Sequence, residues 1–479
     1  MRFRRFLALG LLIVALAGQQ VVATAQDIRN TPRDSSTSDA YRALVGDYDS
    51  EGQLNITLHI SVEGGDLVLS NSVDPTPKRL IPEDVGNLQF VIDHPTPDQV
   101  VFATDDRGNV TYCVVRLAND GVEMTFRRVS SDGEASPDQQ ETTAGSLADY
   151  GWDQSEAAYD SGKIDELRAM IEDGTYKQVK SVIVIKDGDL LVEEYFNGAV
   201  RDELHDPRSV SKTYASAITG IAISEGYLSG VDESLGDVYN LENYDNVGPK
   251  KEEVRIEDLL TMSSGFEGFD FDPASIGNER NMYAKTDWVK WALDLPMATE
   301  RSPGDEWYYF TAGVVILGDI LNRRVPGGLE AYARQKLFKP LGIERYVWPR
   351  TTQGAPSTAG GLRLTPLDMA KFGQLYFDEG EWRGQRVLPQ EWVDESLRRR
   401  YQTTEGVWYG YLWWNRVYNI EGEQYEAYFC NGNGGNKILL FREHGIVIVV
   451  ASSAYDEAYA DPQVDQMITR YILPAVTPE

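Results

Sequence analysis

A serine and a lysine lie three residues apart near the middle of the chain, in a setting that could support nucleophilic catalysis. Ser209 and Lys212 follow Pro207 and lead into an apolar run. A helix N-terminus favours developing negative charge, and a desolvated lysine one turn away can accept the proton of a serine hydroxyl. This spacing predicts a serine nucleophile with a lysine base. The alternative is an N-capping serine beside a solvated lysine, because about one such spacing is expected by chance in a chain of this composition.

The element that would carry this pair is a helix with a buried face. Apolar residues recur at intervals of three and four after Lys212, and they include Tyr214, Ala217, Ile218, Ile221 and Ala222. This periodicity is typical of a helix packed against a core. Pro207 ends the preceding segment, so we expect the helix to begin near Ser209 and to place both side chains on one face.

Residues 1–25 have the pattern of a secretory leader. Three arginines precede an apolar core, and a short Ala-Thr-Ala sequence follows it. The apolar core is shorter than a typical membrane span, and no cysteine follows it that could carry a lipid. We therefore expect an exported protein, periplasmic or extracellular, without a stable membrane anchor.

Composition excludes several other classes of protein. The formal net charge is −30 at pH 7, whereas nucleic-acid binding needs a basic surface. The four histidines and two cysteines show no metal-ligand spacing, and the Gly-x-Ser-x-Gly sequence of many Ser-His-Asp hydrolases is absent. Cys113 and Cys430 are too far apart in sequence to suggest a disulfide. We expect a small-molecule substrate, no nucleic-acid partner, no metal and no cofactor.

The chain divides into two parts after the leader. Residues 41–129 contain short alternating strands separated by turns, which is typical of a small antiparallel barrel or sandwich. Residues 130–150 are polar and rich in turn-forming residues, as expected for a linker. Residues 151–479 mix helical and strand patterns. The predicted β segments of the first part are 54–60, 66–69, 100–103, 110–115 and 124–129.

The second part has strands at both of its ends. We expect a hairpin formed by 181–185 and 190–196 after a helix at 164–172, and a second hairpin formed by 437–441 and 446–450 before a helix near 465–471. Strands at both ends with helices between them indicate one antiparallel sheet with a long helical insert. The predicted fold class is therefore α+β, preceded by the small all-β domain.

Several segments, taken in order, resemble the motifs of one enzyme superfamily. Ser209 to Lys212 resembles its first motif, and 256–266 resembles the "LLTHTSG" landmark with Met262 where histidine is usual. Residues 303–311 resemble "PGxxFxYSN", which puts Tyr309 at the motif tyrosine. Further landmarks are Ala359-Gly360-Gly361-Leu362, 409–414 and Gly432-Asn433-Gly434-Gly435.

This order resembles the serine β-lactamase and DD-peptidase superfamily over residues 151–479. It is most similar to the class C-like and esterase branch, which includes the aminohexanoate-dimer hydrolases. The resemblance implies a β-lactamase/transpeptidase-like fold, an antiparallel sheet flanked by helices with a helical insert. The first domain resembles the small lipocalin-like β-domains that accompany some of these hydrolases.

The resemblance also implies a mechanism. Ser209 attacks an ester or amide carbonyl and forms an acyl-enzyme, and Lys212 and Tyr309 share the proton transfers. Which of the two is the base in the ground state stays open. The oxyanion is expected between the backbone N–H groups of Ser209 and Gly435. Water then releases the acid.

Two departures from the motifs bear on the substrate. Thr311 replaces the asparagine or serine that is common in the second motif. Gly432 replaces the lysine of Lys-Thr-Gly, and Asn433 and Gly434 follow it in the predicted substrate-binding loop. Without that lysine, a substrate carboxylate loses its cation, although Arg442 offers another. We therefore expect esters or small uncharged amides as substrates. The alternatives are a true β-lactamase or DD-peptidase (a penicillin-binding protein) and a non-catalytic cell-envelope binding protein.

Overall fold

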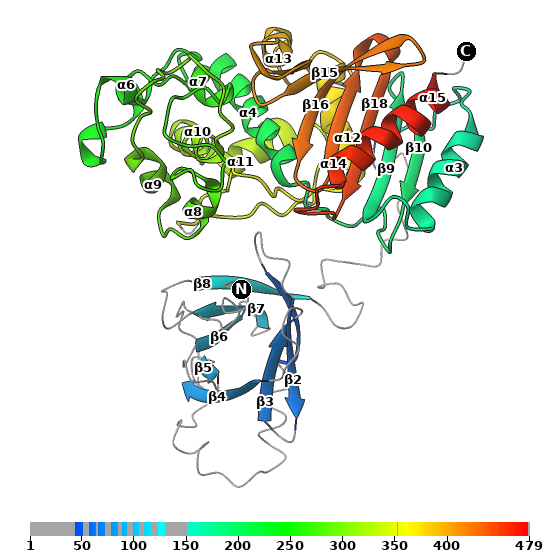
Figure 1. Cartoon of the computed structure of the whole chain (residues 1–479). Helices are drawn as coiled ribbons and strands as arrows, with labels where there is room; N and C mark the ends of the chain where they lie inside the picture. The colour runs from blue at the N-terminus through cyan, green and yellow to red at the C-terminus, as the bar shows by residue number, and fades with distance from the viewer. Residues whose placement is uncertain are drawn as a thin grey trace. The chain divides into compact units, whose positions relative to one another are not determined.

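The computed structural model describes residues 44–50, 57–63, 66–71, 78–84, 89–92, 99–104, 110–116, 123–129, 151–351 and 353–477. They belong to two compact units that divide near residue 143 (Figure 1). The predicted leader, residues 1–25, and the predicted linker, 130–150, lie outside the described residues. The domain boundaries of the sequence analysis therefore stay predictions.

The first unit is a closed antiparallel barrel of eight strands in which each strand pairs with the next and β1 pairs with β8. Alternate residues such as Leu58 and Ile60, or Leu67 and Leu69, are buried inside it, which is the period-2 pattern of a half-buried strand. A small all-β domain is thus confirmed, as a barrel rather than a sandwich. Its strands are β1 Gly46–Ser50, β2 Thr57–Glu63, β3 Asp66–Asn71, β4 Lys78–Asp84, β5 Gln89–Ile92, β6 Gln99–Thr104, β7 Val110–Arg116 and β8 Glu123–Val129.

The second unit is built on an eight-stranded antiparallel sheet with the order β10-β9-β18-β17-β16-β15-β14-β13. The last strand pairs with the first, with Val447 opposite Ile185, so the two ends of the unit complete one sheet as predicted. The strands are β9 Val179–Lys186, β10 Asp189–Tyr195, β13 Tyr401–Thr404, β14 Val407–Tyr409, β15 Trp414–Ile420, β16 Glu423–Gly432, β17 Asn436–Phe441 and β18 Ile446–Ser452. A separate small hairpin pairs β11 Glu381–Trp382 with β12 Gln385–Arg386.

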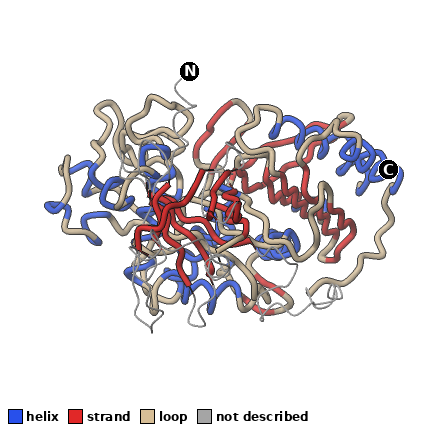
Figure 2. Tube along the Cα trace, turned by 90° about the horizontal axis from the view of Figure 1, so that it is seen from below, coloured by secondary structure: helices blue, strands red, loops and turns tan. Residues whose placement is uncertain are grey.

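Helices cover both faces of this sheet (Figure 1, Figure 2). On β9, Val182 and Val184 face one core with Ile164 of α3, whereas Ile183 and Ile185 face the other. The first face carries α3 Ser161–Glu172, α14 Ala460–Met467, η7 Ile468–Ile472 and α15 Leu473–Val476. The second face carries α4 Lys212–Ser224 and α12 Pro366–Phe377. An antiparallel sheet flanked by helices is therefore confirmed.

The remaining helices lie between β10 and β13 or next to β17. They are η3 Arg208–Ser211, α5 Leu235–Val238, η4 Leu241–Asn243, α6 Pro249–Glu252, α7 Ile256–Leu260, α8 Glu279–Tyr283, α9 Trp288–Asp294, α10 Thr311–Arg324, α11 Leu329–Ala333, η5 Arg334–Phe338, α13 Gln390–Leu397 and η6 Arg442–His444. Within the described part of the chain, no helix combines the length and apolarity that crossing a membrane requires. The turn η3 packs against β16 and β17, which brings the start of α4 to the end of two central strands.

Candidate active site

Ser209 and Lys212 meet where the short turn η3 runs into α4. The Lys212 Nζ donates a hydrogen bond of 2.8 Å to the Ser209 hydroxyl and a second one to the carbonyl of Ala359. Lys212 is 2% exposed, while Ser209 is partly exposed. The structure therefore places the predicted nucleophile and its lysine in direct contact, with the serine as the more accessible of the two.

The residue before the nucleophile has an unusual backbone conformation. Arg208 has φ of +53°, in the left-handed region that non-glycine residues seldom adopt. Its N–H donates to Asp206 Oδ1 at 2.8 Å, and its carbonyl accepts the N–H of Gly361 at 3.1 Å. Its guanidinium lies 4.1 Å from the centre of the Tyr455 ring. These contacts hold the strained turn that presents Ser209.

The segment 359–362, which the sequence analysis named only as a landmark, fixes both reactive groups. The carbonyl of Ala359 accepts the hydrogen bond from Lys212. A Cβ on Gly360 would lie 3.1 Å from the carbonyl oxygen of Arg208, and φ of Gly360 is +152°. The segment therefore needs glycine here, because its backbone approaches the nucleophile turn closely.

Tyr309 is the third predicted catalytic residue, and it lies beside the other two. The Lys212 nitrogen is 5.4 Å from the centre of the Tyr309 ring, and the tyrosine is 7% exposed. Burial raises the pKa of the phenol, whereas the Lys212 charge and hydrogen bonding to Ser209 act to lower it. The structure thus brings together hydroxyl, ammonium and phenol from two separate segments.

Met262, which replaces the usual histidine of its landmark, holds the segment that carries the phenol. Its carbonyl accepts the N–H of Tyr308 at 2.8 Å, and its thioether sulfur accepts the N–H of Phe310 at 3.2 Å. Met262 itself has φ of +58°. The Met262 carbonyl and sulfur thus accept the N–H groups of the residues before and after Tyr309.

Aromatic rings surround the phenol. The ring of Phe271 stacks on Tyr309 at 5.0 Å with an interplanar angle of 9°, and Trp414 stacks at 6.1 Å. Trp307 is tilted against Tyr309 at 6.2 Å. Phe271 is 60% exposed, so an apolar ring next to the phenol is left open to solvent or to a bound molecule.

The turn between β16 and β17 shows where Gly432, the residue compared with the lysine of Lys-Thr-Gly, lies relative to the nucleophile. A Cβ on Gly432 would lie 2.1 Å from the carbonyl oxygen of Pro207 and 3.2 Å from the backbone nitrogen of Ser209. A side chain here would clash with the nucleophile turn, so this contact fits the motif glycine better than the motif lysine, and the predicted place of Gly432 at the lysine is not supported. Counting back two residues puts Cys430 at the lysine position. Its sulfur accepts a hydrogen bond of 3.3 Å from Thr213, the neighbour of Lys212.

Gly435, the predicted oxyanion donor, lies on another side of the turn. A Cβ there would meet the carbonyl of Ala460 at 2.9 Å, at the start of α14. Gly434 packs against Tyr455, and the Asn433 side chain exchanges two hydrogen bonds with Asp456. Gly432, rather than Gly435, is therefore the glycine that contacts the backbone of the nucleophile.

The structure also bears on Thr311, a predicted substrate contact, and on Arg442, which the sequence left open as a substitute for the motif lysine. Thr311 is fully buried at the start of α10, so its side chain is not placed to contact a substrate. Arg442 lies at the end of β17 away from Asn436 and donates to Glu379 at 2.9 Å, so it does not replace the motif lysine. Cys113 and Cys430 are both free and buried.

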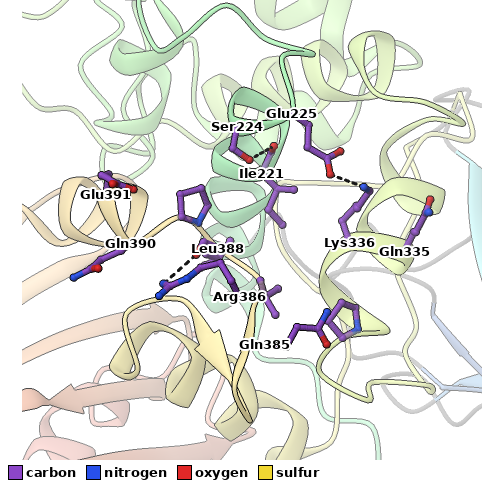
Figure 3. Close-up of a pocket in the computed structure, with 13 residues that line it drawn as sticks. Ile221, Ser224, Glu225, Gln335, Lys336, Gln385, Arg386, Leu388, Gln390 and Glu391 are labelled. Atoms are coloured by element: carbon purple, nitrogen blue, oxygen red, sulfur yellow. Dashed lines mark hydrogen bonds and ion pairs between the residues drawn. The ribbon is translucent and has the colours of Figure 1, made fainter.

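A large surface hollow lies away from this site. It has a volume of about 700 Å³ and is lined by Ile221, Ser224 and Glu225 at the end of α4, with Lys336 opposite (Figure 3). The thirteen residues of α4 separate it from Ser209 by about 20 Å at the rise of a helix. Glu225 and Lys336 already pair with each other there. The hollow therefore belongs to the surface and not to the candidate active site.

Comparison with known proteins identifies the family. The model of the beta-lactamase family matches residues 168–466, which include Ser209, Lys212 and Tyr309. The chain therefore belongs to the beta-lactamase family, and it is a serine hydrolase. Among the described residues, no group of three or more His, Cys, Asp or Glu side chains could hold a metal ion.

Individual relatives agree with this assignment. The chain is 25% identical over 311 residues to a 6-aminohexanoate-dimer hydrolase from Paenarthrobacter ureafaciens, over 60% of this chain and 71% of the relative. The fold is similar to that of EstCE1, a hydrolase with promiscuous acyltransferase activity, with a TM-score of 0.52 and 14% identity over 68% of this chain and 98% of that one. It is also similar to a penicillin-binding protein homologue from Caulobacter crescentus, with a TM-score of 0.50 and 15% identity over 66% and 98% of the two chains. The predicted β-lactamase/transpeptidase-like fold is thus confirmed.

Proposed function

We propose that the protein hydrolyses carboxylic esters and small uncharged amides through an acyl enzyme on Ser209. The observation that carries this proposal is the hydrogen bond of 2.8 Å from Lys212 to the Ser209 hydroxyl, with the Tyr309 ring 5.4 Å from the same nitrogen. A hydroxyl in contact with a buried amine and a buried phenol is the arrangement that activates a serine without histidine.

The steps follow from this arrangement. Ser209 Oγ attacks the substrate carbonyl, and its proton passes to whichever member of the Lys212–Tyr309 pair is deprotonated, either a neutral amine or a phenolate, while a tetrahedral oxyanion forms. The phenol returns a proton to the departing alcohol or amine as the carbonyl reforms. Water then attacks the acyl group, gives its proton to the same pair, and releases the acid and the free serine.

The oxyanion needs two backbone donors near the nucleophile. Gly432 packs against the nitrogen of Ser209, so the N–H groups of Ser209 and of Asn433, the residue after Gly432, are the pair we propose. A comparable donor contributes roughly 10²–10³ in rate in other hydrolases. This replaces the assignment of the donor to Gly435.

Two features favour uncharged substrates. Cys430 stands at the motif lysine position and carries no charge there, because burial raises the pKa of its thiol. The rings of Phe271, Trp307 and Trp414 border the phenol with apolar surface. A substrate carboxylate would lack the cation that penicillin-recognising members offer, whereas an apolar ester group gains contact area.

The test is a substrate panel with the purified protein and the Ser209→Ala variant. We expect short-chain p-nitrophenyl esters to be hydrolysed with a larger kcat/KM than a chromogenic cephalosporin, and the variant to lose hydrolysis of both. A larger kcat/KM for the cephalosporin would favour a true β-lactamase. Equal hydrolysis by Ser209→Ala would remove the serine from the mechanism, and no hydrolysis of any substrate would favour a binding protein.

We also propose that the protein is exported through the leader at residues 1–25. The support is the order of arginines, apolar core and small residues in the sequence. N-terminal sequencing of the protein recovered from a secreting host tests it. A mature N-terminus just after Ala25 is expected, whereas intact protein retained in the cytoplasm would contradict export.

A further inference from the structure

The segment that carries Tyr309 has no regular secondary structure of its own. Residues 308–310 precede α10 and pair with no strand. Backbone N–H and carbonyl groups in such a segment must find partners elsewhere if they are buried. Two of these partners are the carbonyl and the sulfur of Met262, described above. Asp270 supplies two more, one to Tyr309 and one to Thr311 at the start of α10.

Asp270 binds the segment from both its backbone and its side chain. Its N–H donates to the carbonyl of Tyr309 at 2.8 Å, and its Oδ2 accepts the N–H of Thr311 at 2.6 Å. Its Oδ1 accepts the N–H of Glu279 at 2.7 Å. The carboxylate thus joins the N-terminal ends of α8 and α10, where unpaired N–H groups favour negative charge.

The charges around this carboxylate connect it with the candidate catalytic residues. Burial and the neighbouring Glu279 carboxylate raise the pKa of Asp270 to about 6, whereas the hydrogen bond from Thr311 and the Lys212 cation oppose that rise. The charges of Asp270 and Glu279 in turn raise the pKa of Tyr309. Glu279 on α8, Lys212 on α4 and Tyr309 before α10 are therefore the titratable groups that face Asp270.

We propose that Asp270 is a positioning residue that sets the place of the Tyr309 phenol relative to Ser209 and Lys212. This proposal rests on the proposed function. The Asp270 N–H holds the carbonyl of Tyr309, and its carboxylate holds the N–H of Thr311 at the start of α10. Loss of either contact frees the backbone next to the phenol, and a displacement of about 1 Å in an active site costs roughly 10²-fold in rate.

The Asp270→Asn variant tests the side-chain contacts. The amide keeps the shape and one acceptor oxygen, but its NH2 group cannot accept the second N–H. We expect kcat for a small ester to fall by roughly 10²-fold while KM changes little. The matched control is Asp272→Asn on the same loop. The Asp272 side chain is exposed, and among the described residues its carboxylate accepts only the N–H of Ala274, whereas its other contacts come from the backbone, so its variant should keep full activity.

A double-mutant cycle separates positioning from a general structural role. In the Tyr309→Phe background the phenol is already gone, so we expect Asp270→Asn to cost little further activity. Equal losses in both backgrounds, or an unchanged kcat in the single variant, would overturn the proposal. Thermal unfolding of each variant shows whether the loss is one of folding. If Asp270→Asn unfolds at the assay temperature, Asp270→Glu, which keeps a carboxylate but shifts it by one methylene, takes its place in the cycle.

The outcome for Ser209→Ala keeps the two proposals apart. If that variant stays active, the proposed function fails whatever Asp270 does. If Ser209→Ala is inactive, but Asp270→Asn lowers kcat by the same factor in the wild type and in Tyr309→Phe, only the positioning role fails.

Discussion

The buried amino group of Lys212 lies 2.8 Å from the hydroxyl of Ser209, and its second hydrogen bond goes to the carbonyl of Ala359. Within the described residues no carboxylate forms an ion pair with it. A buried lysine whose nearest polar neighbours are a hydroxyl and a carbonyl is arranged for proton transfer rather than for charge pairing. This relationship leads to the first prediction.

Replacing the lysine should remove activity but keep the fold. Lys212→Met has a similar shape and leaves no buried charge, so the unfolding temperature should stay near that of the wild type. Loss of a positioned group that transfers protons typically costs about 10²–10⁴-fold, and we expect kcat for an ester to fall within that range. Steady-state kinetics with thermal unfolding measures both. A kcat within threefold of the wild type would rule out Lys212 as a catalytic group.

The contact between Gly432 and the nucleophile turn can be tested with a single methyl group. Gly432→Ala would place a Cβ 2.1 Å from the Pro207 carbonyl oxygen, so the turn must move. We expect a loss of about 1–3 kcal/mol of stability and at least a tenfold loss of kcat. Gly248→Ala is the control, because nothing lies within 4 Å of a Cβ there. Wild-type kinetics in Gly432→Ala would show that this glycine is not part of the oxyanion site.

The exposed ring of Phe271 should affect substrate choice more than stability. Phe271→Ala removes a ring that stacks on Tyr309 but is 60% exposed. We expect KM for esters with aromatic or long apolar groups to rise several-fold, and KM for methyl esters to change less. Ile276→Ala, at another exposed apolar side chain on the same loop, is the control. An equal change for all esters would contradict a role in substrate choice.

Asp270 should impose an acid limit on activity. Its pKa is raised to about 6, so the carboxylate that accepts two N–H groups is present above that pH and is lost below it. We expect kcat to decrease as the pH falls through 6 in the wild type, and this part of the profile to be absent in Asp270→Asn. If kcat decreases at acid pH in the same way in both proteins, another group causes the decrease.

The raised pKa of Asp270 affects the free energy of unfolding in the opposite direction to its effect on activity. A carboxyl whose pKa is higher in the folded state contributes stability that is fully present below its unfolded value of about 3.8 and is lost as the pH rises through about 6. The unfolding free energy of the wild type relative to Asp270→Asn should therefore increase between pH 6 and pH 4. Denaturant unfolding at both pH values measures this difference.

Much of this site could be predicted from local sequence. Ser209 and Lys212 share a helical turn, and Tyr309 follows a Pro-Gly sequence at a fixed distance, so their spacing carries the information. The paired hairpins at the two ends of the second unit were predicted for the same reason, since alternation and turns are local signals.

The supporting contacts could not be predicted in this way. Whether Gly432 or Gly435 meets Ser209 depends on the path of the turn after β16, which spacing does not fix. Asp270 and Met262 act through backbone groups about forty residues or more away, and no side-chain type specifies such a partner. In the barrel, β1, β4 and β5 were missed because their residues show weak alternation, and pairing with neighbouring strands defines them instead.

In the proposed mechanism Ser209 becomes acylated by the substrate. Intact-protein mass spectrometry after brief incubation with a slowly hydrolysed ester, followed by peptide mapping, tests it most directly. We expect the mass of one acyl group, located on Ser209, and no added mass in Ser209→Ala. An acyl group on any other residue, or ester hydrolysis by Ser209→Ala at the wild-type rate, would contradict it.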